Sequence, residues 1–142
     1  MKKLFTLPTL ILLVMVSLVT LESKAQKQSE FMKLLATEMN KSCPTEAGAG
    51  MVMTKISYID NYFEFNFTND ETTATMAEII DNKSVFKNTL LSTMAEGFKD
   101  PTVAAILKDS KTGFKFNIRG KKSERRCTFT VTNAELLNAI GY

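Results

Sequence analysis

Histidine and tryptophan are absent from the sequence, and cysteine occurs only twice among its 142 residues. Without histidine, the chain can form no His-based catalytic triad and few kinds of zinc site, and it lacks the commonest general base. Gly48–Gly50 lacks the Lys-Ser/Thr pair of a phosphate-binding loop. No exposed strand interleaves basic and aromatic residues, as proteins that bind single-stranded nucleic acid do. We therefore expect no catalytic residue, no cofactor, no metal ion and no nucleic-acid partner.

The first 25 residues have the pattern of a cleavable signal peptide. Met1-Lys2-Lys3 is a basic start, and the 18 residues of Leu4–Leu21 carry no charge. Ser23 and Ala25 are small, which suits a signal peptidase that cuts after Ala25. The alternative is an uncleaved membrane anchor, but polar residues dilute the run, which is at the low end of spanning length. No cysteine follows near the cut, so we predict a periplasmic or secreted protein that is not a lipoprotein.

Cleavage would leave residues 26–142 as a single domain. The net charge would fall from +3 to +1, because the leader carries most of the excess positive charge. Both cysteines lie in the mature part, and an exported chain with an even number of cysteines is expected to form disulfides. We therefore predict a bridge between Cys43 and Cys127. The alternative is two separate buried thiols.

Two segments have the residue alternation of β-hairpins. In residues 51–68, Asp60-Asn61 predicts a two-residue turn, because both residues tolerate positive φ. Pairing about that turn predicts three opposed pairs on one apolar face: Tyr58 with Phe63, Ile56 with Phe65, and Thr54 with Phe67. In residues 114–131, apolar and polar residues alternate on both sides of a turn near Lys122-Ser123. Cys127 lies on the apolar face of this second hairpin. A bridge from Cys43 would therefore attach the end of the first helix to the inner face of the sheet.

Apolar residues recur at helical spacing in five other segments. We expect helices over residues 29–41, 75–80 and 134–140, the last capped by Asn133. Another helix is expected to be capped by Ser84 and to end near Gly97. A further helix is expected to begin at Asp100-Pro101 and to end by Gly113. Residues 45–50 are predicted to be a flexible connector. This order predicts an α+β domain: a four-stranded antiparallel sheet made from two hairpins, with amphipathic helices packed on one face.

Positive charge is concentrated in the second hairpin, where only Glu124 offsets it. The residues of this basic patch are Lys115, Arg119, Lys121, Lys122, Arg125 and Arg126. The predicted register points Lys115, Arg119 and Arg126 away from the core. The patch could contact an acidic protein, an anionic lipid or a polysaccharide. The alternative is a solvated hairpin whose charges prevent pairing with another sheet edge.

Several stretches resemble small exported proteins of unknown function from Bacteroides-type bacteria. They are Ser23-Lys24-Ala25-Gln26, Asn40-Lys41-Ser42-Cys43-Pro44, Asn61-Tyr62-Phe63-Glu64-Phe65, and Asn82-Lys83 leading into Leu90-Leu91. The resemblance implies a periplasmic or secreted setting. It implies no activity and assigns no functional residue.

Three hypotheses about function follow from these features. The first is an exported, non-enzymatic module that binds a protein or another ligand, because the export signal is present and catalytic groups are missing. The second is an inhibitor or immunity-type protein that blocks a secreted enzyme with the basic patch. The third is an enzyme that uses carboxylates, which would need a deep cleft with two convergent acids.

Overall fold

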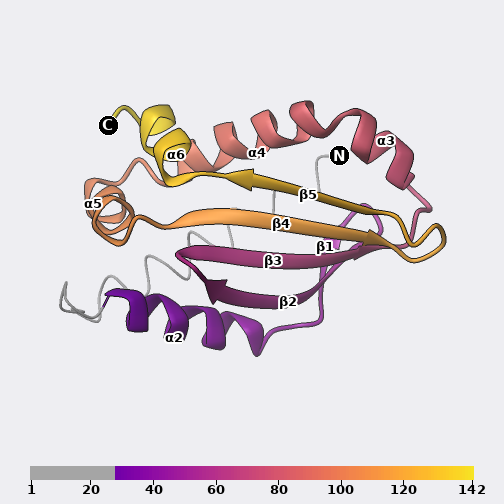
Figure 1. Ribbon diagram of the computed structural model, residues 1–142, viewed down its shortest axis with the longest axis horizontal. Helices are drawn as coiled ribbons and strands as arrows, with labels where there is room; N and C mark the ends of the chain where they lie inside the picture. The colour runs from indigo at the N-terminus through magenta and orange to yellow at the C-terminus, as the bar shows by residue number, and fades with distance from the viewer. Residues whose placement is uncertain (1–27) are drawn as a thin grey trace.

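The computed structural model of the protein describes residues 28–142. The predicted signal peptide and its cut after Ala25 lie outside these residues. Within them, five strands form one sheet in the order β1-β2-β3-β4-β5 (Figure 1). The strands are β1 (Thr45–Gly48), β2 (Met51–Ile59), β3 (Tyr62–Asn69), β4 (Gly113–Gly120) and β5 (Arg126–Val131).

The α+β class is confirmed, but the sheet differs from the prediction in two respects. The segment predicted as a connector contributes β1, which pairs antiparallel with β2 at one edge. The two hairpins are joined through β3 and β4, and this pair is parallel. The sheet is therefore mixed and five-stranded instead of antiparallel and four-stranded. Parallel neighbours require a long crossover, and the helices between β3 and β4 supply it.

The two faces of the sheet differ in chemistry, as the alternation predicted. One face, here called the helix face, carries a ladder of aromatic rings. The in-register pairs Phe63–Phe114 and Phe65–Phe116 place rings of β3 and β4 side by side, with centroids 5.7 and 5.4 Å apart. Phe129 on β5 continues the ladder, 5.2 Å from Phe116. All five rings are buried, so they form the centre of the core.

The first hairpin has the predicted turn. Asp60 and Asn61 adopt φ of 52° and 66°, and Tyr58 faces Phe63 as expected. The third predicted pair is wrong, because a bulge after Met53 makes that residue the partner of Phe67. The extra residue, Thr54, is exposed, so Met53 lies in the core in its place.

Helices lie along both edges of the sheet in Figure 1: α2 is beside β2, and α3 and α4 are beside β5. The helices of the described residues are α2 (Gln28–Asn40), α3 (Met76–Asp81), α4 (Lys83–Gly97), α5 (Pro101–Ser110) and α6 (Asn133–Ile140). All five segments predicted as helical are helices. The Asp100 side chain accepts hydrogen bonds from the backbone N–H of Thr102 and Val103, as a cap should.

Two of the predicted caps are wrong. Asn82, and not Ser84, precedes α4, and its side chain makes no capping hydrogen bond. Thr132, and not Asn133, caps α6, with Glu135 completing a capping box. Asn133 instead donates its amide to the carbonyl oxygens of Leu107 and Thr112, at 2.9 and 2.8 Å.

The predicted bridge between Cys43 and Cys127 is not supported, because both residues are free thiols in the structure. Cys43 lies two residues before β1, at one edge of the sheet, and Cys127 is on β5, at the other. Adjacent strands are about 4.8 Å apart, so the two edges are about 19 Å apart. A disulfide requires Cα atoms within roughly 7 Å. Burial raises the pKa of both thiols, which keeps them protonated at neutral pH.

We therefore predict two titratable thiols in protein purified without reductant. Iodoacetamide in denaturant should add two carbamidomethyl groups, as measured by mass spectrometry. In the native protein, Cys127 should react much more slowly than Cys43, because it is buried and Cys43 is partly exposed. A mass with no added groups until a reductant is supplied would contradict this arrangement.

Candidate functional site

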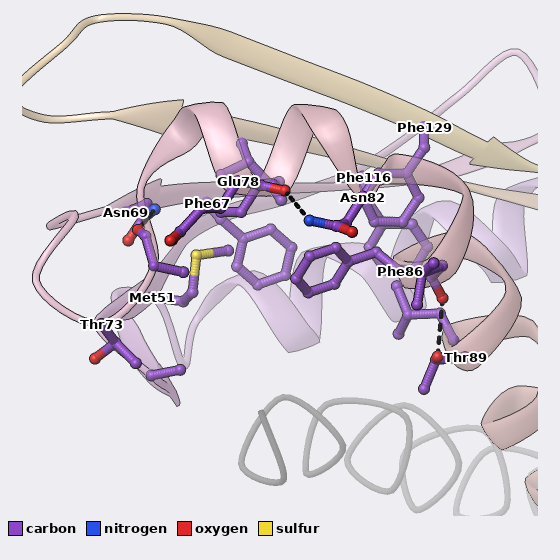
Figure 2. A pocket seen from close by; sticks show the side chains of 16 residues that line it. Met51, Phe67, Asn69, Thr73, Glu78, Asn82, Phe86, Thr89, Phe116 and Phe129 are labelled. Atoms are coloured by element: carbon purple, nitrogen blue, oxygen red, sulfur yellow. Dashed lines mark hydrogen bonds between the residues drawn. The ribbon is translucent and has the colours of Figure 1, made fainter.

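A cavity of about 540 Å³ lies between the helix face of the sheet and the helices α3 and α4 (Figure 2). Its volume is within the range of ligand sites, about 300–1,000 Å³, whereas protein interiors ordinarily leave few voids larger than a water molecule. Most of the lining is apolar. The sheet contributes Met51, Phe67, Phe116, Ile118 and Phe129, and the helices contribute Ile79, Val85, Phe86 and Leu90.

The cavity lies beside the first half of α4, whose apolar side chains are at most partly buried. The buried residues of α4 are Leu90, Met94 and Ala95, all in its second half. In the first half, Val85 is 60% exposed and Phe86 is only partly buried. Both line the cavity, so large apolar side chains face a space that no part of residues 28–142 fills.

Three polar residues of the lining, Glu78, Asn82 and Thr89, already have hydrogen-bond partners within or next to the helices. Glu78 closes the capping box of α3, because its carboxylate accepts from the Thr75 backbone N–H at 2.8 Å. The Asn82 amide donates to the Glu78 carbonyl oxygen, and the Thr89 hydroxyl donates to the Val85 carbonyl oxygen, both at 2.8 Å (Figure 2). The cavity therefore offers apolar surface and few unengaged polar groups, which suits an apolar ligand.

Asn69 closes one end of the cavity and is fully buried. Its amide donates to the Ala74 carbonyl oxygen at 2.8 Å, and its side-chain oxygen accepts from the Glu71 backbone N–H at 2.9 Å. These bonds fold the segment that leads from β3 into α3. Asn69 therefore fixes the segment that closes this end of the cavity. Its side-chain amide and oxygen both bond to protein groups.

Glu71 attaches α3 to the turn between β4 and β5. One carboxylate oxygen accepts from the backbone N–H groups of Lys122 and Ser123, at 2.9 and 2.7 Å, and the other accepts from Met76 at 3.2 Å. These hydrogen bonds lower the pKa of Glu71, that from Ser123 being the largest cause. A Cβ at Gly120 would overlap the Met76 side chain and the same carboxylate, so a larger residue there would displace them.

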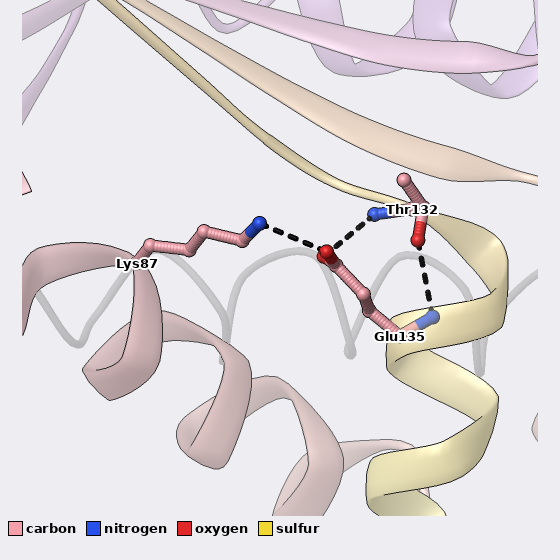
Figure 3. A network of polar contacts seen from close by, with 3 residues as sticks. All are labelled: Lys87, Thr132 and Glu135. Atoms are coloured by element: carbon pink, nitrogen blue, oxygen red, sulfur yellow. Dashed lines mark hydrogen bonds and ion pairs between the residues drawn. The ribbon is translucent and has the colours of Figure 1, made fainter. Parts of the chain in front are cut away.

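A second attachment holds α4 against α6 (Figure 3). The Lys87 ammonium lies 2.9 Å from one oxygen of Glu135, whose other oxygen accepts from the Thr132 backbone N–H at 3.1 Å. The hydrogen bond from Lys87 lowers the pKa of Glu135. These contacts join α3 to the β4–β5 turn and α4 to α6, so both helices that border the cavity are tied to the rest of the fold.

Groups for acid–base or metal chemistry do not meet in this site. Glu78 is the single carboxylate of the lining, and its oxygen caps a helix. Residues 28–142 contain no cluster of three or more His, Cys, Asp or Glu side chains that could hold a metal ion. The paired acids that a carboxylate-based enzyme would need are therefore missing from the lining of this cavity.

The basic patch lies elsewhere. Lys115, Arg119 and Arg126 alternate with buried residues of β4 and β5, so they point to the face opposite the aromatic ladder, as predicted. We call this the open face, because no helix crosses in front of the strands in Figure 1. Lys121, Lys122 and Arg125 are exposed in the turn beyond it. The structure therefore divides the predicted patch between a sheet face and a turn.

The sequence analysis did not find the cavity. It assigned Phe86 and Leu90 to an ordinary core stripe, but only Leu90 is buried. One signal was available: Val85 and Phe86 are adjacent, so they cannot both belong to a narrow helical stripe that faces one partner. Such a pair at the start of a helix indicates apolar surface in excess of what the fold covers.

Comparisons with known proteins identify a shared fold. No family model and no curated protein matches the sequence. A candidate secreted protein of Pseudomonas aeruginosa has a similar structure, with a TM-score of 0.60, 10% identity, and coverage of 81% of this chain and 98% of that one. The pilotin of the Vibrio vulnificus type 2 secretion system has a TM-score of 0.52 and 21% identity, covering 78% of this chain and 93% of that one. At these identities, the likeness is one of fold.

None of the helices in the described part of the chain is both long and apolar enough to span a membrane.

Replacing Glu71 with Gln should lower stability at neutral pH. The charged carboxylate stabilises the fold above the pKa of an unfolded glutamate, about 4.3, and this contribution is lost as the pH falls through the lower folded pKa. The melting temperature of Glu71→Gln should therefore be below that of the wild type at pH 7, and the gap should close towards pH 3. Glu124→Gln, in the same turn, is the control and should change little at either pH. A gap for Glu71→Gln that is equally wide at both pH values would contradict this role.

Proposed function

We propose that this protein is an exported, non-enzymatic binding module, and that its cavity receives the apolar face of a helix from a partner protein. The observation that carries the proposal is the apolar space between the aromatic floor and the helices α3 and α4. An exported setting, periplasmic or secreted, is supported by the leader pattern of the first 25 residues.

A helix is the occupant that the surrounding geometry favours. The cavity belongs to the helix layer of the domain. In this layer, α2 runs along one edge of the sheet, and α3 and α4 run along the other edge (Figure 1). A helix is about 10 Å across with its side chains, which is also the spacing at which helices pack on one another. One inserted between the existing helices would complete the layer, with side chains at i, i+3, i+4 and i+7 reaching the floor.

The chemistry of the lining supports binding over catalysis. The side chains of Glu78, Asn82 and Thr89 make hydrogen bonds within the protein, so they are not free to act on a substrate. The exposed Val85 and the partly buried Phe86 offer apolar surface to a partner, and aromatic side chains contribute strongly to binding energy at protein interfaces. One protein of similar fold, the pilotin, belongs to a secretion system, which agrees with a role in protein assembly.

The proposal can be tested with a displayed library of amphipathic helical peptides, selected on the purified wild-type protein. We expect the selected peptides to share an apolar i, i+3, i+4, i+7 pattern. Their affinity for Val85→Glu should be lower by about tenfold or more, because the new carboxylate would lose its hydration against the bound helix. Fluorescence anisotropy of a labelled peptide measures both affinities.

Leu34→Glu is the matched control for this experiment. Leu34 lies on α2, is 60% exposed like Val85, and does not line the cavity. Its substitution should leave peptide affinity unchanged. Failure to select any helical peptide, or equal affinities for the two variants, would refute a helix-binding cavity.

A further inference from the structure

We propose that the open face of the sheet is a second binding site, separate from the cavity, and that it takes an acidic polysaccharide. The chain of sugars would lie along β4 and β5, with one carboxylate at Arg119 and Arg126 and another at Lys115. The site is indicated by the register of these strands, by the absence of an ion pair at any of the three cations among the described residues, and by the polar row between them.

Arg119 and Arg126 are directly opposite each other in the antiparallel pair β4–β5, and both are exposed. Like charges in this position destabilise a sheet. None of the three ion pairs found in residues 28–142 includes either arginine. Two neighbouring guanidinium groups can each donate a forked pair of hydrogen bonds to a carboxylate, which would also relieve their repulsion.

Across β3, β4 and β5, the next row of residues on the open face is uncharged and already ordered, and the exposed Lys55 of β2 lies beside its Asn66 end. Asn117 lies beside Asn66 on β3 and opposite Thr128 on β5. Its amide nitrogen is 3.2 Å from the side-chain oxygen of Asn66, and its oxygen accepts from the Thr128 hydroxyl at 2.9 Å. These hydrogen bonds fix a flat row of amide and hydroxyl groups, whose remaining donors and acceptors suit the hydroxyl groups of a sugar.

Lys115 provides the second positive position. It lies four residues from Arg119 on the same strand, a distance of about 13 Å. Its ammonium is 5.5 Å from the centre of the Tyr62 ring, whose side chain covers Gly113. Glu64, its direct neighbour on β3, accepts a hydrogen bond from Asn117 at 3.1 Å and forms no ion pair with Lys115. The Tyr62 ring therefore positions Lys115, whose positive charge is offset in part by the neighbouring Glu64 carboxylate.

Along β4 and β5, the charged pair Arg119 and Arg126 is followed by the uncharged pair Asn117 and Thr128, and then by Lys115. This order favours a polysaccharide over other anionic partners. A lipid surface would be attracted by any exposed cations, above all those at the tip of the turn. At the tip of the turn, Lys121 and Lys122 lie near Asp70, a carboxylate whose pKa is lowered chiefly by hydrogen bonds from Thr72 and to a smaller extent by these two lysines, so its charge offsets part of theirs. A polymer that carries hydroxyl groups between its carboxylates can use all three rows.

The test is the affinity of the purified protein for polygalacturonate, measured by isothermal titration calorimetry, with neutral dextran and phosphatidylglycerol vesicles as comparison ligands. We expect binding to polygalacturonate that weakens with added salt, and no binding to dextran. The double variant Arg119→Gln/Arg126→Gln should lose about tenfold or more in affinity. Thr128→Val, which removes one hydroxyl from the uncharged row, should also weaken binding.

Lys33→Gln/Lys108→Gln is the matched control, because it removes two exposed cations from α2 and α5. It should bind polygalacturonate as the wild type does. An equal loss in both double variants would overturn the proposal in favour of unspecific attraction by net charge. Binding to the vesicles but not to polygalacturonate would overturn it in favour of a membrane surface. No binding to any ligand would also overturn it. Helical peptides should bind all of these variants normally, so the result is independent of the cavity.

Discussion

The parallel pairing of β3 with β4 is the constraint on which the remaining architecture depends. β3 ends at Asn69, and β4 begins at the opposite end of the sheet, where the Gly113 backbone N–H donates to the Asn61 carbonyl oxygen at 2.9 Å. The chain must return along the whole sheet before β4 can start. It does so as α3, α4 and α5, and the first two of these helices form the roof of the cavity. If β4 had been antiparallel to β3, a short link would have sufficed and this roof would not be needed.

Polar contacts connect the two helices that cover the cavity, α3 and α4, to the rest of the fold. At one end, the Glu71 carboxylate binds backbone groups of the β4–β5 turn and of α3. At the other, Lys87 and Glu135 join α4 to α6. Phe86 packs against the core but is only partly buried, and apolar surface left accessible to water costs about 25 cal/mol per Å².

The sequence predicted the local structure much better than the way its parts are joined. Alternation identified both hairpins, and Asp60-Asn61 identified the first turn, because these signals depend on neighbouring residues.

The parallel junction and the edge strand β1 depend on pairing between distant segments, which alternation does not specify. The disulfide prediction failed for the same reason: cysteine count and compartment say nothing about which edge of a sheet each cysteine occupies. The cavity was not predicted, because it depends on how α3 and α4 are placed over the sheet, and the adjacent apolar residues Val85 and Phe86 were its only signal in the sequence analysis. The orientation of Lys115, Arg119 and Arg126 was predictable, since it follows from the two-residue repeat of a strand.

The two proposed sites lie on opposite faces of one sheet, and this has a mechanical consequence. Alternate residues of β4 serve different sites: Phe116 and Ile118 line the cavity, whereas Lys115, Asn117 and Arg119 belong to the open face. Neither ligand would therefore obstruct the other, and a protein of this kind could hold a partner helix and an anionic polymer at the same time. Because β4 is an interior strand paired on both sides, neither site can move without breaking the sheet. This interior strand thus provides a rigid connection between the two proposed ligands.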